Sequence, residues 1–152
     1  MANTLVQLNV HIVFRVKISS IRILEDDLPR LFEFMGGIIR RNDGIPMQIG
    51  GMPDHIHILC TLPKTMTLSN LVRLIKVGTH KWLRNNNKEY YTHFLWQDGY
   101  GAFSVSSSGL EGLTKYIQNQ KGHHRDISFV EEYKLFLDHA GIQYDERFAF
   151  ND

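Results

Sequence analysis

Hydrophobic and polar residues alternate with a period of two near the start of the chain. Over residues 5–16 the apolar side chains share one face of the predicted strand: Val6, Leu8, Val10, Ile12, Phe14 and Val16. The polar side chains fall largely on the other face: Gln7, Asn9, His11 and Arg15. This alternation is typical of a strand with one face against a core. A second alternating strand is predicted at 55–62, with shorter strands at 45–50 and 102–107.

Apolar residues at helical spacing predict helices between these strands. The stretch 25–42 begins with three acids, which favour a helix start, although Gly36 and Gly37 cost about 2 kcal/mol relative to alanines. A second helix is predicted at 67–84, with its basic residues mostly outward and Asn85 to Asn87 ending it. A third begins at Ser108, where the spacing to Glu111 predicts a capping box, and a last amphipathic helix is predicted at 128–140.

The order of these elements is β-α-β-β-α-β followed by two helices. It predicts an α+β, ferredoxin-like split β-α-β fold with an antiparallel sheet and added C-terminal helices. We find neither a repeat nor a linker, so residues 1–152 are expected to form one domain. A chain of 152 residues with 43% hydrophobic and 22% charged residues has ordinary globular composition, which excludes disordered and low-complexity classes.

Cysteine content and hydropathy indicate the compartment. Cys60 is the only cysteine, so the chain forms no internal disulfide, and its start does not read as a signal peptide. No apolar run approaches the roughly 20 residues that cross a bilayer. We therefore expect a cytoplasmic protein without a membrane partner.

Charge is distributed unevenly although the net charge is only +1. Residues 1–24 and 64–88 carry basic residues and no acid, whereas 126–152 holds seven acids against two basic residues. This pattern is compatible with a basic face that binds a polyanion, and equally with scattered solvated lysines.

Two histidines in the second alternating strand are the strongest candidates for chemistry. His55 and His57 lie on the same strand face about 6.5–7 Å apart, close enough to bind one metal ion. A histidine pair is more often a polar sheet face, but two unpaired imidazoles in an apolar strand are costly to bury. The neighbouring Asp54 either orients His55 or caps the turn.

The third helix carries Tyr116 and Gln120 at i, i+4 spacing, beside a core stripe of Leu110, Leu113 and Ile117. A tyrosine hydroxyl is able to form a covalent bond with a substrate, and a glutamine oxygen is able to complete a metal site. Taken alone, this pair is better explained by packing.

Four motifs together carry a resemblance to a known family. Residues 53–57 (PDHIH) resemble the His-hydrophobic-His (HUH) motif, and residues 116–120 (YIQNQ) resemble the Tyr-x-x-x-Gln helix of single-tyrosine HUH transposases. The segments 11–17 and 96–106 also match. The chain thus resembles, over about residues 5–140, the transposases of bacterial insertion sequences and their REP-associated relatives. After Lys17 it departs from them, with Ile18, Ser19 and Ser20 in place of aromatic and basic residues.

The resemblance implies a metal-dependent nuclease and strand transferase acting on single-stranded DNA. His55, His57 and Gln120 would hold Mg²⁺ or Mn²⁺, with Zn²⁺ as a further option for imidazole ligands. Tyr116 would attack the scissile phosphate, giving a 5′-phosphotyrosine and a free 3′ hydroxyl that allow rejoining without ATP. His123 and His124 are either additional ligands or phosphate contacts, or solvated loop residues.

The resemblance also implies partners. Relatives bind DNA hairpins, and the expected phosphate contacts are the basic residues of the second helix with two secondary candidates: Arg73, Lys76, His80, Lys81, Arg84, Arg15 and Lys17. We expect a homodimer at the bacterial nucleoid, with His55 and His57 from one chain and Tyr116 from its partner. The serine-rich stretch 104–108 with Gly109 and Gly112 would act as the hinge.

Two other functions remain open from the residues. One is a non-catalytic ferredoxin-like nucleic-acid-binding module with a structural histidine pair, and the other is a metal hydrolase that uses water as nucleophile. The fate of the DNA separates them: a covalent protein adduct, intact DNA, or two free ends.

Overall fold

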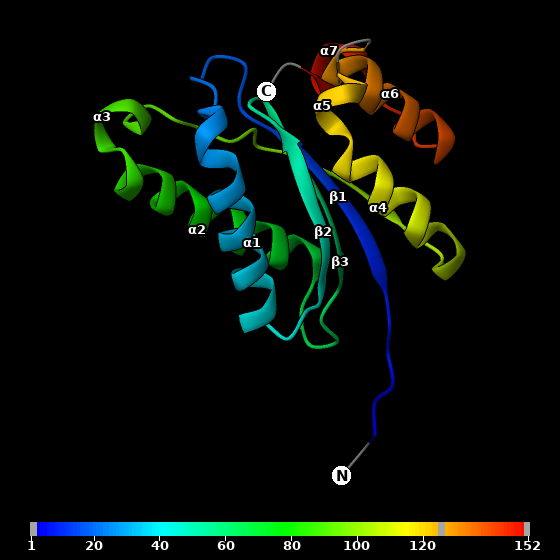
Figure 1. The fold of residues 1–152 in the computed structure, drawn as a ribbon. Coiled ribbons are helices and arrows are strands. Elements are labelled where there is room, and N and C mark those ends of the chain that lie inside the picture. The colour runs from blue at the N-terminus through cyan, green and yellow to red at the C-terminus, as the bar shows by residue number, and fades with distance from the viewer. Residues whose placement is uncertain (1–2, 125–126, 151–152) are drawn as a thin grey trace.

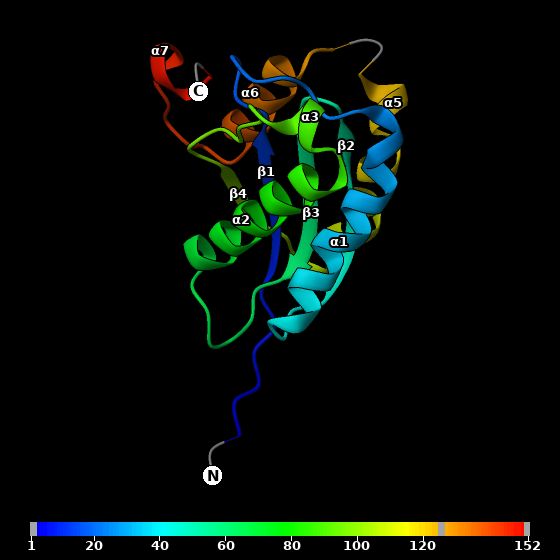
Figure 2. The ribbon, with the colours of Figure 1, turned by 90° about the vertical axis from the view of Figure 1, so that its left-hand side faces the viewer.

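The computed structural model describes residues 3–124 and 127–150. Its centre is an antiparallel sheet in the order β2-β3-β1-β4 (Figure 1; β4 is labelled in Figure 2). The strands are β1 (Asn9–Arg15), β2 (Pro46–Met52), β3 (His55–Thr61) and β4 (Gly101–Ser104). In the central pair, Val13 lies opposite His57 and Arg15 opposite His55. This strand order is that of a split β-α-β sheet, which confirms the predicted fold class.

Helices cover both faces of the sheet (Figures 1 and 2). One face carries α1 (Leu28–Arg41), which follows the short helix η1 (Glu25–Asp27), together with α2 (Leu68–Asn86) and α3 (Lys88–Tyr91). The other carries α4 (Leu110–Gln118), α5 (Gln120–His123), α6 (Phe129–His139) and α7 (Glu146–Ala149). A short helix η2 (Ser107–Gly109) leads into α4.

The main core lies between the sheet and the helices α1 and α2. The strand residues that face it are apolar and fully buried: Ile12, Phe14, Ile56, Ile58 and Cys60. They pack against helix residues such as Leu31, Met35, Leu71 and Ile75. Full burial of one such side chain stabilises the fold by about 1.5–3 kcal/mol, so this layer supplies most of the apolar stabilisation.

The opposite face holds a smaller apolar core. It joins Val13 of β1 to the helices α6 and α7 through Phe129, Tyr133, Leu137 and Phe150. The rest of this face, between β3 and the helices α4 to α6, holds the buried polar side chains together with the apolar Leu59 and Ile117. The two faces of one sheet therefore have different chemistry.

Several boundaries differ from the sequence predictions. β1 begins at Asn9 and not at residue 5, because Val6 and Leu8 remain about half exposed outside the sheet pairing. The predicted capping box of Ser108 is wrong: Ser108 Oγ contacts Ser106 Oγ, and α4 follows a 3₁₀ turn without a side-chain cap. Side-chain caps that were not predicted begin four helices: Thr67 for α2, Asn87 for α3, Ser128 for α6 and Asp145 for α7.

Within residues 3–124 and 127–150, no helix combines the length and the apolar character needed to cross a bilayer.

Candidate active site

Strand β3 carries the histidine pair. Alternation along this strand directs Ile56 and Ile58 into the main core and directs His55 and His57 to the opposite face, where both are fully buried. The ring centroids of the two histidines are 5.2 Å apart. Their side chains therefore converge, as the sequence predicted.

Helix α4 lies directly on β2 and brings Tyr116 to the histidines. A Cβ on Gly50 would lie 2.6 Å from the carbonyl oxygen of Ile117, so only glycine permits this approach. The α-helix is interrupted at Asn119, after which Gln120 begins α5. The Tyr116 ring centroid is 6.0 Å from that of His57.

Gln120 reaches the same site from α5. Its Oε1 lies 2.9 Å from His55 Nε2, and its side chain is buried. One chain thus brings together all four residues predicted to act in chemistry, and Tyr116 lies beside the histidine pair of its own chain.

A carboxylate that sequence reasoning missed lies among these residues. Glu132 of α6 is 1% exposed and accepts hydrogen bonds from His57 Nε2 at 2.7 Å and from the Tyr116 hydroxyl. Gln120 Nε2 donates at 3.3 Å to Glu132 Oε2, the oxygen that also accepts from Tyr116. The sequence does contain a signal for this buried position, because Glu132 falls at helical spacing within the inward apolar stripe of Phe129, Tyr133 and Phe136.

His11 and Asp54 hold the outer nitrogens of the two histidines. Asp54 Oδ1 is 2.7 Å from Nδ1 of His55, so this carboxylate orients His55. The sequence predicts His11 only as a polar residue of the strand. In the structure its Nε2 lies 2.8 Å from Nδ1 of His57. The Nε2 atoms of both histidines are thereby left to face the site.

His124 also joins the site, although it follows the last turn of α5. Its Nδ1 bonds the Ile127 carbonyl at 2.8 Å, and its Nε2 lies 3.1 Å from both Gln120 Oε1 and Glu132 Oε2. Of the two interpretations of His124, the solvated loop residue is therefore wrong.

The surroundings shift the pKa values of the groups in the site. Burial alone would raise the pKa of Glu132, but hydrogen bonds from His124, His57 and Tyr116 outweigh it and hold that pKa far below its usual range. Burial and the bond to Glu132 raise the pKa of Tyr116. Burial also lowers the pKa of His57. Tyr116 accordingly keeps its proton, and a positive charge is needed to make it reactive.

The donor set fits a divalent cation. One ligand atom from each of His55, His57, His124 and Glu132 lies within 4.8 Å of the others. His123 Nε2 is buried without a hydrogen-bond partner among the described residues, 3.5 Å from Glu132 Oε2. Imidazole nitrogen together with carboxylate and amide oxygen suits Mn²⁺ and related ions.

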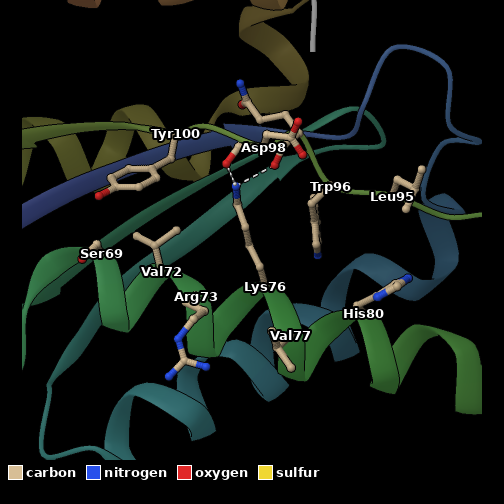
Figure 3. Close-up of a pocket in the computed structure, with 11 residues that line it drawn as sticks. Ser69, Val72, Arg73, Lys76, Val77, His80, Leu95, Trp96, Asp98 and Tyr100 are labelled. Atoms are coloured by element: carbon tan, nitrogen blue, oxygen red, sulfur yellow. Dashed lines mark hydrogen bonds between the residues drawn. The ribbon is translucent and has the colours of Figure 1, made fainter.

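The residues predicted to bind DNA lie mostly on α2, across the sheet from the histidines. Arg73, Lys76 and His80 line a groove of about 380 Å³ between α2 and the segment 95–100 (Figure 3). Lys76 Nζ donates to the carbonyls of Gln97 and Gly99 at 2.7 Å each, so this side chain also holds the loop. Arg73, Lys81 and Arg84 are exposed.

The two secondary candidates have other contacts. Arg15 is only 7% exposed, and its guanidinium lies over the ring of Phe129 at 5.3 Å. Lys17 forms an ion pair with Asp98 at 3.8 Å. Because α6 covers Arg15, a DNA contact by this residue would require that helix to move.

Comparison with known proteins is consistent with this geometry. Residues 4–120 match the family model described as transposase, IS200 like. None of the curated proteins matches the chain. The family match ends at Gln120, so it covers Tyr116 and both strand histidines but neither His124 nor Glu132.

Two solved structures share the fold. One is a candidate transposase from Deinococcus radiodurans R1, with a TM-score of 0.62 and 18% identity over 79% of this chain and 95% of that one. The other is a REP-associated tyrosine transposase bound to a REP hairpin, with a TM-score of 0.59 and 15% identity over 82% of this chain and 73% of that one.

Proposed function

Because the chain belongs to the IS200-like transposase family, and is thus a transposase that acts on DNA, we propose that it cleaves and rejoins single-stranded DNA through Tyr116. The observation that carries this proposal is the position of the Tyr116 hydroxyl. It bonds Glu132, which also bonds His57 and Gln120, and the rings of Tyr116 and His57 are 6.0 Å apart. Residues 1–152 are taken as one domain for this activity.

His55, His57 and Gln120 would hold Mg²⁺ or Mn²⁺ at the scissile phosphate. When bound, the cation withdraws charge from the phosphate oxygens and from the attacking phenol. Asp54 and His11 bond the Nδ1 atoms of His55 and His57 and so orient their Nε2 atoms toward the cation, as partners of metal-binding histidines do. His55, His57 and Gln120 are themselves buried, so little water surrounds the position of the cation, whereas Tyr116 is half-buried.

Tyr116 acts as the nucleophile. Its oxygen forms a bond to phosphorus while the bond from phosphorus to the 3′ oxygen breaks, so the 5′ end becomes attached to the protein. The phenol loses a proton, and the released 3′ oxygen gains one. Attack by the 3′ hydroxyl of a second strand reverses these changes, and because the ester bond is conserved, rejoining needs no ATP.

DNA hairpins are the proposed substrate, supported by the REP hairpin in one structural neighbour. Arg73, Lys81 and Arg84 of α2 would contact phosphates, which set affinity and not sequence choice. Lys17, Lys76 and His80 are further candidates at the groove beside α2 and its neighbouring loop. Such a substrate would place the enzyme at the nucleoid of a bacterial cytoplasm.

The direct test is a denaturing gel after incubation with hairpin-bearing single-stranded DNA and Mn²⁺. We expect a covalent protein–DNA adduct that Tyr116→Phe abolishes, because only the hydroxyl is removed. Hairpin binding by this variant should match wild type. Tyr144→Phe, which removes a hydroxyl bonded to Asp138 outside the site, is the control and should keep the adduct. Intact DNA, or two free ends without adduct, would refute the proposal.

We also propose that two chains form a homodimer that exchanges its tyrosine helices. The described chain holds Tyr116 at its own histidines, so exchange would require residues 104–109 to redirect α4. Mixing Tyr116→Phe with His57→Ala subunits tests this. Exchange gives the heterodimer one intact site, whereas without exchange a verified heterodimer stays inactive. A monomer by light scattering would refute the dimer itself.

A further inference from the structure

The C-terminal helix α6 contributes to the site a side chain that the family match does not cover. The match ends at Gln120, twelve residues before Glu132 along the chain. The carboxylate of Glu132 nevertheless contacts Tyr116, Gln120, His57 and His124. A buried carboxylate with this many contacts is costly to maintain as packing alone.

We propose that Glu132 is a direct ligand of the divalent cation, together with His55 and His57. This inference rests on the proposed function and extends it, because it makes α6 a part of the active site. The ligand set then contains one carboxylate oxygen from outside residues 4–120, which the family model matches.

The orientation of the two histidines supports this assignment. Both direct their Nε2 atoms at the same carboxylate oxygen, Glu132 Oε1, at 2.7 Å for His57 and 3.6 Å for His55. On the side away from the site, Nδ1 of His57 is hydrogen-bonded to His11 and Nδ1 of His55 to Asp54. Metal-binding histidines typically have one nitrogen on the metal and the other bonded to such a partner.

Charge gives a second, independent argument. The other donors in the cluster, which are imidazoles and the Gln120 amide, are neutral when they bind a cation. Hard cations such as Mg²⁺ and Mn²⁺ prefer oxygen ligands, and at least one carboxylate is usual. Glu132 is the buried carboxylate whose oxygen lies within 4.8 Å of the ligand atoms of His55, His57 and His124.

The first experiment titrates the full chain with Mn²⁺ by calorimetry. Glu132→Gln keeps the shape of the side chain and removes its charge, and it should weaken Mn²⁺ binding by at least about tenfold. Glu131→Gln, on the exposed side of the same helix, is the matched control and should bind as wild type does. Equal affinity in wild type and Glu132→Gln would overturn the inference.

The second experiment separates direct ligation from an indirect effect on affinity. Co²⁺ replaces Mn²⁺ as the probe, because its visible absorption bands depend on its ligands. At saturating Co²⁺ the bands of Glu132→Gln should differ from those of wild type, and identical bands would overturn the inference. If Glu132→Gln does not fold in EDTA, Glu132→Asp replaces it, since this variant keeps the charge but moves the oxygen back; the same criteria then decide.

His57→Ala distinguishes failure of the inference from failure of the proposed function. Loss of Mn²⁺ binding in His57→Ala with full binding in Glu132→Gln would refute the role of Glu132 alone. Wild-type binding in His57→Ala, or no binding by the wild type, would instead refute the metal site of the proposed function and the inference with it.

Discussion

The two faces of the sheet are equally buried but differently built. On β3, Ile56 and Ile58 are 0% exposed against α1 and α2, and His55 and His57 are 0% exposed against α4 to α6. The first face excludes water with apolar contacts. The second excludes it with imidazole, carboxylate and amide groups that bond one another. Burial by itself therefore does not reveal which face carries the chemistry.

The two faces of the sheet contribute differently to the free energy of folding. Each buried aliphatic side chain contributes about 1.5–3 kcal/mol to folding, whereas a hydrogen bond contributes a net of only about 0.5–1.5 kcal/mol. The face with α1 and α2 thus stabilises the sheet on which the polar face is assembled. Substitutions in the face that packs against α1 and α2 should mainly lower the free energy of unfolding. Substitutions in the polar face should mainly change metal binding and formation of the DNA adduct.

The largest contrast is expected between neighbours on β3. Ile58→Ala should lower the free energy of unfolding by about 2–5 kcal/mol, since it leaves a cavity in the main core. Mn²⁺ affinity of the folded fraction should stay unchanged. His57→Ala should abolish Mn²⁺ binding and cost about 1–3 kcal/mol, because a hydrogen bond of the buried Glu132 is lost. Urea unfolding in EDTA and Mn²⁺ calorimetry measure the two effects.

A second test concerns how α4 is seated on the sheet. Gly50→Ala places a methyl group 2.6 Å from the Ile117 carbonyl, so α4 must shift and Tyr116 with it. We expect a loss of about 1–3 kcal/mol in unfolding free energy and slower formation of the DNA adduct.

Gly112→Ala is the matched control in α4, where a Cβ meets nothing within 4 Å among the described residues. This variant should gain up to about 1 kcal/mol, because alanine favours the helix more than glycine does. Gly112 was predicted as part of a hinge, so impaired adduct formation in Gly112→Ala would point to a need for flexibility there. If Gly50→Ala has the stability and the adduct rate of wild type, this result would contradict the close packing of α4 on β2.

The contrast between the faces also marks what the sequence was able to predict. Alternation in β1 and β3 identified the face of each strand. The spacing of Tyr116 and Gln120 showed only that they share a helix face, and it was the resemblance of residues 116–120 to the transposase motif that implied a place at the histidines. The partners of that face were not predictable in the same way. An alternating pattern gives the face on which Arg15 or His11 lies, but not that α6 covers it.

Glu132 shows a second limit of prediction from the sequence. Its position in an apolar helical stripe was visible, but helical spacing does not identify what a helix packs against. The α6 helix meets the histidines only through the tertiary fold, 75 residues from His57 in the chain. The capping box failed for a local reason, since the 3₁₀ turn at Ser107–Gly109 precedes α4.

A third effect should appear in the pH dependence of stability. Burial and the neighbouring His57 lower the pKa of His11 to about 3, so between pH 6.5 and about 3 the unfolded chain binds a proton that the folded chain does not. Stability therefore falls as pH decreases, by up to about 1.4 kcal/mol per pH unit from this group.

His11→Gln should remove this contribution. Urea unfolding in EDTA at pH 6.5 and 4.5 should give a smaller difference for His11→Gln than for wild type. His93→Gln, at an exposed position, should behave as wild type does. An unchanged pH dependence in His11→Gln would contradict the burial of a neutral imidazole at this position.

The smallest effect on stability is expected on the outer surface of α2. Lys81 is exposed, so Lys81→Ala should change the unfolding free energy by less than about 0.5 kcal/mol. If its ammonium contacts a phosphate, hairpin affinity should fall for every hairpin sequence, and the slope of log affinity against log salt should decrease by about 1. Arg41→Ala removes an exposed charge from α1 on the same side of the sheet and is the matched control. Equal losses in both variants would show that general positive charge, and not a surface centred on α2, attracts the DNA.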